Sequence, residues 1–374
     1  MTRDRDFMIT ALRLAQRGLG NVWPNPAVGC VIVAAPEFGR QVLGRGWTQP
    51  GGRPHAETVA LDQVRARFGA DALVGAHVYV TLEPCSHTGQ TPPCAEALSK
   101  ARVGRVIVAC EDPDPRVSGE GIRQLREAGI TVETDLGLAQ AETINAGFLM
   151  RVLAGRPFVS LKTATTSDGR IATRTGVSQW ITGDAARAHA HHMRAMHDAI
   201  AVGAGTVAAD NPSLTCRLPG MSDRSPLRVV FDSHLSTPND SLLVTTAREV
   251  PTWIVACNGA DPDRRAMLEK AGVRVLTVVG VDGRVDPKAA LSALGAEGIT
   301  RLMVEGGAQI STSLLRAGLV DQLLWFRAPS LIGGDGMPPF GDLGVGDMTD
   351  MPAFRSVERR PVGDDMLDIF VRVP

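Results

Sequence analysis

One histidine and two cysteines stand in an order that favours a metal centre. The chain reads Pro54-His55-Ala56-Glu57, and further along Glu83-Pro84-Cys85 and then Cys94. One imidazole and two thiolates are ligands that zinc takes at a catalytic site, where a fourth coordination position stays open for water. The sequence therefore predicts a catalytic zinc site whose ligands are His55, Cys85 and Cys94.

Glu57 follows the histidine by two residues, and this spacing gives it a chemical role. In the His-x-Glu…Pro-Cys pattern the glutamate carries protons and is not a metal ligand. Zinc lowers the pKa of its bound water towards neutrality, so that hydroxide forms at physiological pH. Glu57 can take the proton of that water and deliver it to a leaving amine. We therefore expect hydrolytic deamination of an aminated heterocycle, with Glu57 as the catalytic residue.

A strand and a helix have to position these ligands. The run His77–Leu82 is strand-like and ends just before Cys85, and Pro92-Pro93-Cys94 is typical of a helix start. A helix N-terminus favours the thiolate form that binds metal. Two alternatives stay open: His87, between the cysteines, is a rival ligand, and a purely structural zinc would take four protein ligands.

Length and composition limit the classes of protein. A chain of 374 residues predicts two domains, and 44% hydrophobic with 21% charged residues is typical of a soluble globular protein. A net charge of −1, with no basic stripe, argues against a nucleic-acid partner. No apolar run is long enough for a membrane span, the start is too polar for a secretory signal, and six cysteines are no disulfide framework. We expect a cytoplasmic enzyme with a small-molecule substrate, and a homo-oligomer.

Hydrophobic periodicity predicts strands that alternate with helices in both halves. In the first half we expect strands at 28–34, 41–46, 78–82, 105–110 and 130–133, and helices at 4–17, 55–68, 94–101, 119–128 and 138–153. In the second half we expect strands at 158–162, 199–203, 228–232, 252–257, 273–279, 301–305 and 321–328, helices at 183–196, 262–271, 287–297 and 308–317, and a closing antiparallel hairpin that includes 366–373. The alternation indicates α/β architecture with mostly parallel sheets. A break at Gly155-Arg156-Pro157 places the boundary near 150–156, giving domains 1–152 and 153–374.

Two segments of the second half have features of a ligand site. Leu302–Ala308 is a buried strand that runs into two glycines and a helix, where backbone N–H groups can meet a phosphate. It lacks Gly-x-Gly-x-x-Gly, so the Rossmann fingerprint is absent. Gly203–Pro212 is interpreted as a strand end that leads into a polar turn. Each segment is a common pattern when taken alone.

Several motifs together carry a family resemblance. Eight residues separate Cys85 from Cys94, where nucleoside deaminases have two, and this insertion and Pro24–Cys30 resemble the pyrimidine deaminase of riboflavin biosynthesis. The segments 164–172, 178–182, 203–212 and 302–308 resemble the reductase of the same pathway. The whole chain is therefore similar to the bifunctional riboflavin-pathway deaminase-reductases. The resemblance implies an N-terminal cytidine-deaminase-like three-layer α/β/α domain and a C-terminal dihydrofolate-reductase-like α/β domain.

The resemblance also implies two consecutive reactions and two cofactors. Zn²⁺ would serve deamination of 2,5-diamino-6-ribosylamino-4(3H)-pyrimidinone 5′-phosphate. NADPH would then reduce the ribosyl group, giving 5-amino-6-ribitylamino-uracil 5′-phosphate. A rival hypothesis is a nucleoside, base or tRNA deaminase with an unrelated second domain, and another is that one half has lost its activity.

By motif match, the resemblance places NADPH and the substrate on two sets of residues. The NADPH set is Ala164, Trp180, Thr206, Asp210, Ser233, Gly307, Ala308, Gln309, Ile310, Ser311, Thr312 and Ser313. The substrate set is Asn25, Lys162, Ser178, Arg194, Leu214, Arg217 and Glu305.

Some members of the substrate set have a physical rationale. Arginine suits bidentate binding of the substrate phosphate, which favours Arg194 and Arg217. Lys162 could polarise the carbonyl, and Glu305 could hold the ribose hydroxyls. Asn25, held between two prolines, could bind the sugar or the base edge, as an asparagine ahead of the histidine does in related deaminases.

Three assignments keep a second interpretation beside the first. Asn25 could equally form only a turn. Glu83 could orient the base or the ligand loop, or simply cap a helix. The cluster His189, His191, His192 and His197 raises a second metal site as an alternative, although these side chains lie on mixed faces of a helix and the family has no metal there.

Overall fold

The computed structural model describes residues 2–87, 92–114 and 118–373. The chain forms two compact units, Met1–Gly155 and Arg156–Pro374, called here the N-terminal and the C-terminal unit. The division expected between residues 152 and 153 falls inside the last helix of the N-terminal unit, α5 (Leu138–Ala154). Within the described residues, no helix is both long enough and apolar enough to cross a membrane.

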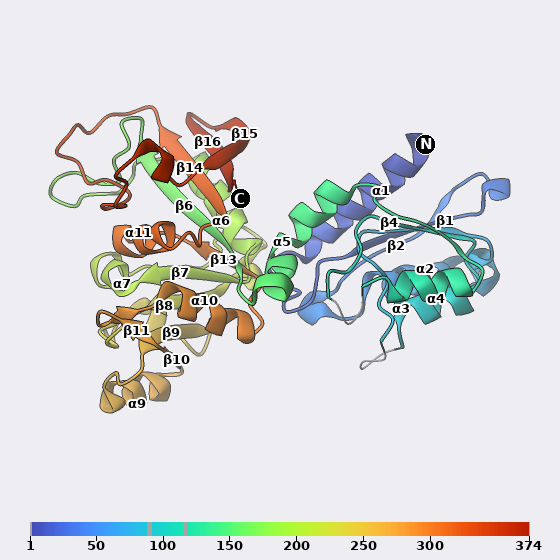
Figure 1. Ribbon diagram of the computed structural model, residues 1–374, viewed down its shortest axis with the longest axis horizontal. Helices are drawn as coiled ribbons and strands as arrows, with labels where there is room; N and C mark the ends of the chain where they lie inside the picture. The colour runs from blue at the N-terminus through green and yellow to red at the C-terminus, as the bar shows by residue number, and fades with distance from the viewer. Residues whose placement is uncertain (1, 88–91, 115–117, 374) are drawn as a thin grey trace. The chain divides into compact units, whose positions relative to one another are not determined.

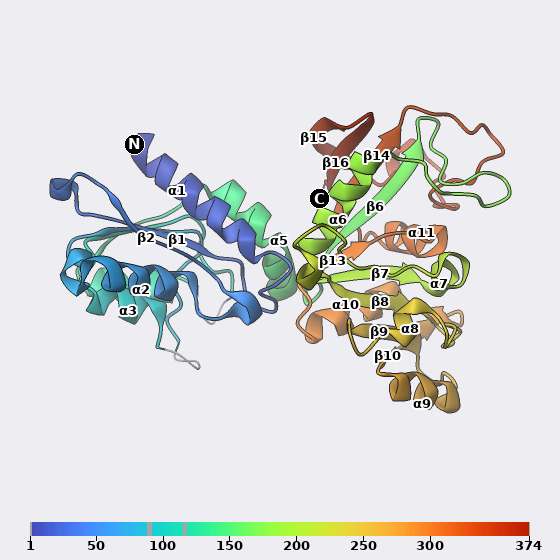
Figure 2. The same ribbon diagram turned by 180° about the vertical axis from the view of Figure 1, so that it is seen from behind.

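The N-terminal unit is a five-stranded sheet with helices on both faces (Figures 1 and 2). The strand order is β2-β1-β3-β4-β5. The strands are β1 (Gly29–Val33), β2 (Val42–Trp47), β3 (His77–Val80), β4 (Arg105–Val108) and β5 (Thr131–Glu133). The helices are α1 (Thr2–Ala15), α2 (Ala56–Phe68), α3 (Cys94–Lys100), α4 (Glu120–Glu127) and α5. Helices α1 and α5 cover one face and α2, α3 and α4 the other, which confirms the predicted three-layer α/β/α architecture.

The direction of β1 differs from the expectation of a mostly parallel sheet. β1 pairs antiparallel with both β2 and β3, whereas β3–β4 and β4–β5 are parallel. The cause is the short connection between β1 and β2, which turns at Gly39 with φ 82°. Parallel neighbours need a crossover of about a dozen residues or more, and this connection is too short to supply one.

Two glycines of β2 let the helix that begins at the metal site lie directly on the sheet. A Cβ at Gly46 would stand 2.0 Å from the carbonyl oxygen of Ala56, and one at Gly44 would stand 2.5 Å from that of Ala60. Real Cβ atoms do not approach backbone oxygen so closely, so any side chain here has to displace α2. The spacing Gly-x-Gly therefore fixes the depth at which α2 carries Glu57.

Replacing Gly46 with alanine is expected to destabilise the N-terminal unit by about 1–3 kcal/mol, because overpacking forces α2 off the sheet. Deaminase activity should fall as well, since α2 carries Glu57. Calorimetric unfolding and ammonia release would measure the two effects. Arg45→Ala, at the exposed position between the glycines, is the control and should change stability by less than about 0.5 kcal/mol. Equal effects of the two variants would contradict this account of the packing.

The C-terminal unit is a nine-stranded sheet in the order β10-β9-β8-β7-β13-β6-β14-β16-β15. All pairs from β10 to β14 are parallel, and β14–β16 and β16–β15 are antiparallel. The strands are β6 (Phe158–Thr166), β7 (Ala199–Gly203), β8 (Leu227–Phe231), β9 (Thr252–Cys257), β10 (Arg274–Val278), β13 (Arg301–Val304), β14 (Gln322–Ala328), β15 (Phe354–Val362) and β16 (Asp365–Arg372). The helices are α6 (Asp184–Ala195), α7 (Ala204–Asp210), α8 (Leu242–Thr245), α9 (Pro262–Ala271), α10 (Pro287–Ala296) and α11 (Ala308–Arg316). The predicted closing hairpin is confirmed as β15–β16.

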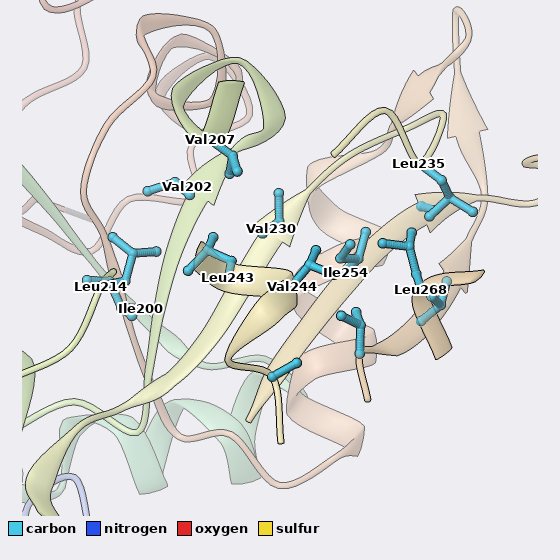
Figure 3. Packing of buried hydrophobic residues seen from close by; sticks show 14 residues of the cluster. Ile200, Val202, Val207, Leu214, Val230, Leu235, Leu243, Val244, Ile254 and Leu268 are labelled. Atoms are coloured by element: carbon cyan, nitrogen blue, oxygen red, sulfur yellow. The ribbon is translucent and has the colours of Figure 1, made fainter. Parts of the chain in front are cut away.

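A buried apolar cluster on β7, β8 and β9 anchors this unit (Figure 3). Ile200, Val230 and Ile254 come from the three strands, and Val207 from α7 and Leu268 from α9 pack against them. The strand end predicted at the start of 203–212 is confirmed, since β7 ends at Gly203, but the prediction of a polar turn after it is wrong, because residues 204–210 form α7. Val207 is buried in the cluster, and tertiary packing of that kind overrides the turn signal.

Hydrophobic periodicity did not predict three short elements of the C-terminal unit. They are α8 and the two-residue strands β11 (Gly280–Val281) and β12 (Arg284–Val285). Two to four residues are too few for a hydrophobic period to repeat, so periodicity cannot indicate these elements.

Candidate functional sites

The three predicted metal ligands meet at one end of the N-terminal sheet. His55 is the residue just before α2, Cys85 lies in the loop after β3, and Cys94 is the first residue of α3. His55 Nδ1 lies 3.6 Å from Cys85 Sγ and 3.4 Å from Cys94 Sγ, and the ligand atoms all lie within 4.8 Å of one another. Tetrahedral zinc, with its usual bond lengths, sets ligand atoms about 3.5 Å apart. The donor set therefore fits zinc in chemistry and in spacing.

The local backbone stabilises the thiolate form of Cys85. The backbone N–H of Cys94 donates to Cys85 Sγ at 3.3 Å, at the N-terminus of α3. Hydrogen bonds with Cys94 and then His55 outweigh burial and lower the pKa of the Cys85 thiol to about 4. A thiolate held in this way is the form that binds metal.

Glu57 lies in the first turn of α2 and is 4% exposed. Burial, reinforced by the charge of Cys85, raises the pKa of Glu57 to about 7. A carboxyl group that titrates near neutrality can both accept and release a proton. Glu57 is not part of the ligand group, which agrees with the predicted role of proton carrier rather than ligand.

The alternative ligand His87 stands apart from this group. Its side chain is exposed, and among the described residues the metal-ligating group consists of His55, Cys85 and Cys94 without it. A structural zinc with four protein ligands therefore has no counterpart in the described part of the chain. Part of the insertion, residues 88–91, lies outside the described residues.

Asn25 and Glu83 support the ligand segments. The amide of Asn25 packs on Gly52, where a Cβ would stand 1.9 Å from Asn25 Nδ2, so Asn25 lies beside the turn that precedes His55. The carboxylate of Glu83 accepts four backbone N–H groups at 2.8–3.2 Å, from Asp112 and from the start of α4. Glu83 therefore caps α4, as one interpretation expected, and the same hydrogen bonds also hold the ligand loop. This cap ties the loop that carries Cys85 to α4.

The N-terminal unit also contains a cavity of about 650 Å³ between α1 and α5. Its lining includes Met8, Leu12 and Ile144 but none of the metal ligands. This cavity is therefore not the site of deamination. Within the described residues, the groups that deamination needs come together at the metal ligands, so the reaction belongs there.

In the C-terminal unit, the glycine turn after β13 meets α7. Gly306 and Gly307 have φ values of 101° and 77°, which favour glycine. A Cβ at Gly307 would stand 3.1 Å from Thr206 Oγ1, so two separately predicted NADPH residues lie side by side. The first hydrogen bond inside α11 runs from Ser311 N–H to the Gly307 carbonyl. The N–H groups of residues 308–310 therefore precede the helical ladder and are suited to a phosphate.

Other predicted NADPH residues differ in accessibility. The side chains of Ile310, Ser311 and Thr312 are buried, and Thr312 Oγ1 both donates to Ala308 O and accepts from Gly341 N. Contacts from these three to a cofactor are thus limited to the backbone. Of the remaining predicted positions, Ala164 and Ser313 are partly buried, and Gln309 and Asp210 are exposed. Trp180 is 66% exposed and stacks on Arg187. The hydroxyl of Ser233 accepts from the backbone N–H of Val285.

Three predicted substrate residues gather beside this turn. Arg194 Nε and Nη2 donate to the two oxygens of Glu305, each at 2.7 Å. Burial opposes the charge of Glu305, but Arg194, with help from Lys162, lowers its pKa to about 2. Burial in turn lowers the pKa of Lys162, while Glu305 counteracts that effect. Glu305 is therefore the fixed negative charge between two cations.

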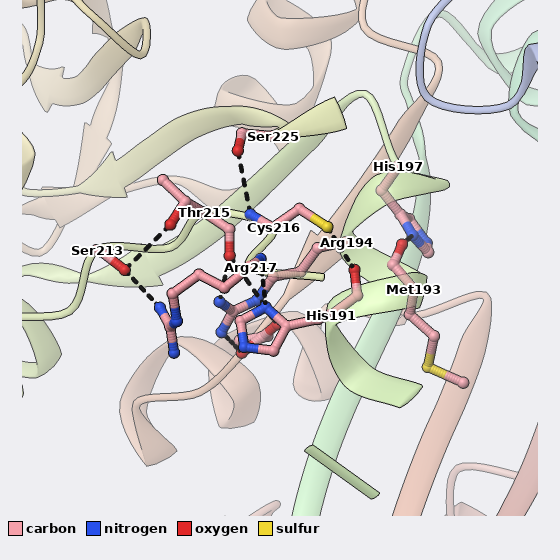
Figure 4. A network of polar contacts seen from close by, with 10 residues as sticks. His191, Met193, Arg194, His197, Ser213, Thr215, Cys216, Arg217 and Ser225 are labelled. Atoms are coloured by element: carbon pink, nitrogen blue, oxygen red, sulfur yellow. Dashed lines mark hydrogen bonds and ion pairs between the residues drawn. The ribbon is translucent and has the colours of Figure 1, made fainter. Parts of the chain in front are cut away.

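This pairing changes the interpretation of Arg194. The fork that suits a phosphate is occupied by Glu305, and Nη1 donates to Thr215 O at 2.9 Å. The guanidinium of Arg217 is exposed and hydrogen-bonds Ser213 Oγ at 2.6 Å. Leu214 is buried in the apolar core, so its contact to a substrate is restricted to the backbone, and Ser178 is partly buried. Figure 4 shows this region, including the Thr215 carbonyl, a backbone group that no sequence pattern could indicate.

Three histidines on and just after α6 contact different partners. His189 Nε2 contacts Arg360 Nη2 at 2.7 Å, and His191 Nδ1 lies 3.1 Å from Thr215 O. His197 contacts Met193 O through Nδ1 at 2.7 Å and Ser160 Oγ through Nε2 at 3.0 Å. Across the described ranges, the group suited to a metal contains none of these histidines. The alternative of a second metal site therefore finds no support.

His197 makes the stability of the C-terminal unit depend on pH. Burial, reinforced by Arg301, lowers the pKa of His197 to about 4, whereas an unfolded chain keeps the ordinary value near 6.5. Between these values the unfolded chain takes up a proton that the native histidine does not. Stability should therefore decrease as the pH falls from about 6.5 to about 4, by at most about 3 kcal/mol.

Urea unfolding of the full chain at about pH 7 and about pH 5 measures this contribution. The difference between the parent and His197→Gln isolates it, because other titrating groups are common to both proteins. We expect the variant to lose less stability on acidification. A pH dependence that is the same in both proteins would rule out His197 as its source.

The comparisons with known proteins agree with a deaminase unit followed by a reductase unit. Residues 1–110 match the family model of the cytidine and deoxycytidylate deaminase zinc-binding region, and residues 157–367 match that of the RibD C-terminal domain. The riboflavin biosynthesis protein RibD of Bacillus amyloliquefaciens is 43% identical over 361 residues, covering 96% of this chain and 94% of the relative. That of Escherichia coli K12 is 39% identical over 375 residues, covering 97% and 98%.

Solved structures extend the agreement to the whole fold. Acinetobacter baumannii RibD, form 1, superposes with a TM-score of 0.87 at 35% identity, covering 100% of this chain and 99% of that one. A Thermotoga maritima diaminohydroxyphosphoribosylaminopyrimidine deaminase/5-amino-6-(5-phosphoribosylamino)uracil reductase superposes with a TM-score of 0.85 at 32% identity, covering 99% of both chains.

Fold and sites together define a zinc-dependent deaminase joined to an NADPH-dependent reductase. Both predicted domain folds, the cytidine-deaminase-like and the dihydrofolate-reductase-like, are confirmed. The chain belongs to the RibD family of bifunctional riboflavin biosynthesis enzymes.

Proposed function

We propose that the N-terminal unit deaminates 2,5-diamino-6-ribosylamino-4(3H)-pyrimidinone 5′-phosphate and that the C-terminal unit reduces the ribosyl group of the product with NADPH. The observation that carries the first half is the meeting of His55, Cys85 and Cys94 within 4.8 Å, beside the buried Glu57. The second half is supported by the glycine turn at α11 and the adjacent Lys162, Arg194 and Glu305.

The residues of the N-terminal unit have distinct tasks. His55, Cys85 and Cys94 would hold zinc, which when bound acts as a Lewis acid and lowers the pKa of water at its open position. Glu57 accepts the proton of the attacking water at its carboxylate and passes it to the departing ammonia. Asn25, which lies beside the turn before His55, holds the sugar or base edge of the substrate in this proposal.

In the C-terminal unit, this chain's residues bind and orient. The N–H groups at the start of α11, with Thr206, would receive phosphate groups of NADPH, which when bound supplies the hydride. Lys162 polarises the substrate carbonyl and stabilises the oxygen as negative charge develops on it. Glu305 keeps Lys162 charged, and the exposed guanidinium of Arg217 binds the substrate phosphate. The other contacts to NADPH or substrate remain part of the proposal, namely Ala164, Ser178, Trp180, Asp210, Leu214, Ser233 and residues 309–313.

Setting and assembly complete the proposal. A reducing cytoplasm is supported by six cysteines that are all free in the structure. A net charge of −1 favours a small molecule over a nucleic acid as partner. We include a homo-oligomer in the proposal, and exposed apolar side chains of the C-terminal unit such as Val177, Leu331 and Met348 are candidates for its interface.

The test is to incubate purified protein with the diaminopyrimidine phosphate, with and without NADPH, and to follow ammonia and nicotinamide oxidation separately. Ammonia should appear in both samples, and oxidation should follow only where deaminated product forms. Cytidine, guanine and tRNA serve as competing substrates. Ammonia from one of these, and none from the pyrimidine phosphate, would contradict the proposal.

A further inference from the structure

The loop after α7, residues 211–217, carries two predicted substrate residues, Leu214 and Arg217. Leu214 is buried in the core and has φ 54°, so the middle of the loop is anchored. Arg217 lies at the end of the loop, and its guanidinium is exposed. Over the described ranges, no carboxylate forms an ion pair with this guanidinium, which leaves it suited to an anion. The side chain has one anchor of its own, since Nη1 donates to Ser213 Oγ at 2.6 Å, and the backbone from which it extends is held separately.

One face of α6 holds that backbone. His191 and Arg194 are three residues apart on the helix and therefore project from the same side (Figure 4). Arg194 Nη1 donates to Thr215 O at 2.9 Å, and the backbone N–H of Arg217 donates to His191 Nδ1 at 3.3 Å. Cys216 Sγ in turn contacts His191 O at 3.4 Å. The loop is thus attached to α6 on both sides of Cys216.

The hydrogen-bond partners of the loop favour a His191 ring whose Nδ1 is unprotonated. His191 Nδ1 lies 3.1 Å from Thr215 O and 3.3 Å from the backbone nitrogen of Arg217. Thr215 O also accepts from Arg194, whereas His191 Nδ1 is the partner that the described residues offer to the Arg217 N–H. If Nδ1 is unprotonated, the N–H and the carbonyl both have partners. Burial and the cations Arg194 and Arg217 lower the pKa of His191, which favours the neutral ring.

We propose that His191 is a positioning residue of the reductase: by accepting the backbone N–H of Arg217, it aims the Arg217 guanidinium at the substrate phosphate. This inference rests on the proposed reductase function and deepens it. His191 does not touch substrate or cofactor in this account. It acts through Arg217, so its removal should weaken binding of a phosphorylated substrate and leave the hydride step unchanged.

Two amide variants of the full-length enzyme separate this role from packing. His191→Asn places a side-chain acceptor near the position of Nδ1, whereas His191→Gln places it near Nε2. With deaminated substrate and NADPH, we expect His191→Gln to raise the KM for the substrate about three- to tenfold, with kcat within about twofold. His191→Asn should stay close to the parent. His192→Gln, at the exposed neighbouring position, is the matched control and should have no effect.

Three further readouts distinguish positioning from stability. The KM for NADPH should not change in His191→Gln, and neither should kcat/KM for a dephosphorylated substrate. In an Arg217→Met background, His191→Gln should add nothing, because the two residues act as one unit. Loss of NADPH binding, an equal loss on the dephosphorylated substrate, an additive double variant, or a Gln variant as mild as the His192 control would each overturn the inference.

The two proposals can fail separately. A parent enzyme that does not oxidise NADPH with the deaminated substrate contradicts the proposed function and, with it, this inference. A parent enzyme that is active while His191→Gln behaves as the control contradicts the inference alone.

Discussion

Replacing Glu57 with glutamine is expected to reduce ammonia release between about 10²- and 10⁴-fold, the range that a positioned general acid-base contributes. Glutamine has nearly the same shape but cannot carry a proton between the water and the leaving amine. Because Glu57 is not part of the ligand group, zinc content should stay at the parent level. Oxidation of NADPH on supplied deaminated substrate should also survive, since that reaction belongs to the other unit.

These three measurements on one preparation make the result specific. If the variant loses bound zinc as well as ammonia release, the substitution has damaged the metal site and has not removed proton transfer alone. Deamination by Glu57→Gln at the parent rate would remove Glu57 from the mechanism. Glu57→Asp, which keeps the carboxyl group but withdraws it by one methylene, should fall between the parent and the glutamine variant.

Cys94→Ser should remove bound zinc and abolish deamination. A serine hydroxyl is a poor ligand for zinc, and His55 with Cys85 would remain as the two protein ligands in the described part of the chain. Cys94 is also the first residue of α3, with 2% of its surface exposed, so the N-terminal unit should lose metal-derived stability as well. Metal analysis after dialysis and thermal unfolding measure the two effects.

Cys110→Ser is the matched control, because Cys110 is also a buried cysteine of the N-terminal unit but is not a ligand. It should retain zinc and ammonia release. Full zinc occupancy in Cys94→Ser would show that another residue supplies the third ligand, and His87 is the candidate to test next. In that case His87→Ala should lose the metal. If Cys94 is the ligand, His87→Ala should keep it.

The sequence contained enough to predict the metal site because its ligands occur in a fixed order with local signals. His55 and Cys94 each stand at a helix start, and Cys85 follows a strand, so capping and periodicity place all three. The structure brings them together at the distances that zinc requires. Zinc as the cofactor of this unit and the two predicted domain folds are confirmed.

What could not be predicted depends on contacts between residues that are distant in the chain. Arg194 and Glu305 are 111 positions apart, and their pairing takes away the fork that was predicted to bind phosphate. Glu83 reaches Gly121, 38 positions on, and caps α4. Neither contact leaves a local pattern, because each partner alone resembles an ordinary charged residue. The direction of β1 and the helix α7 were likewise decided by connection length and by packing of the core.

The most direct test of the central claim is X-ray absorption spectroscopy at the zinc edge of the purified enzyme. We expect one zinc whose protein ligands are two sulfurs and one nitrogen, with an oxygen from water in the remaining position. A spectrum with four protein ligands, such as two sulfurs and two nitrogens, would contradict it, because no open position would then remain for the water that the reaction needs.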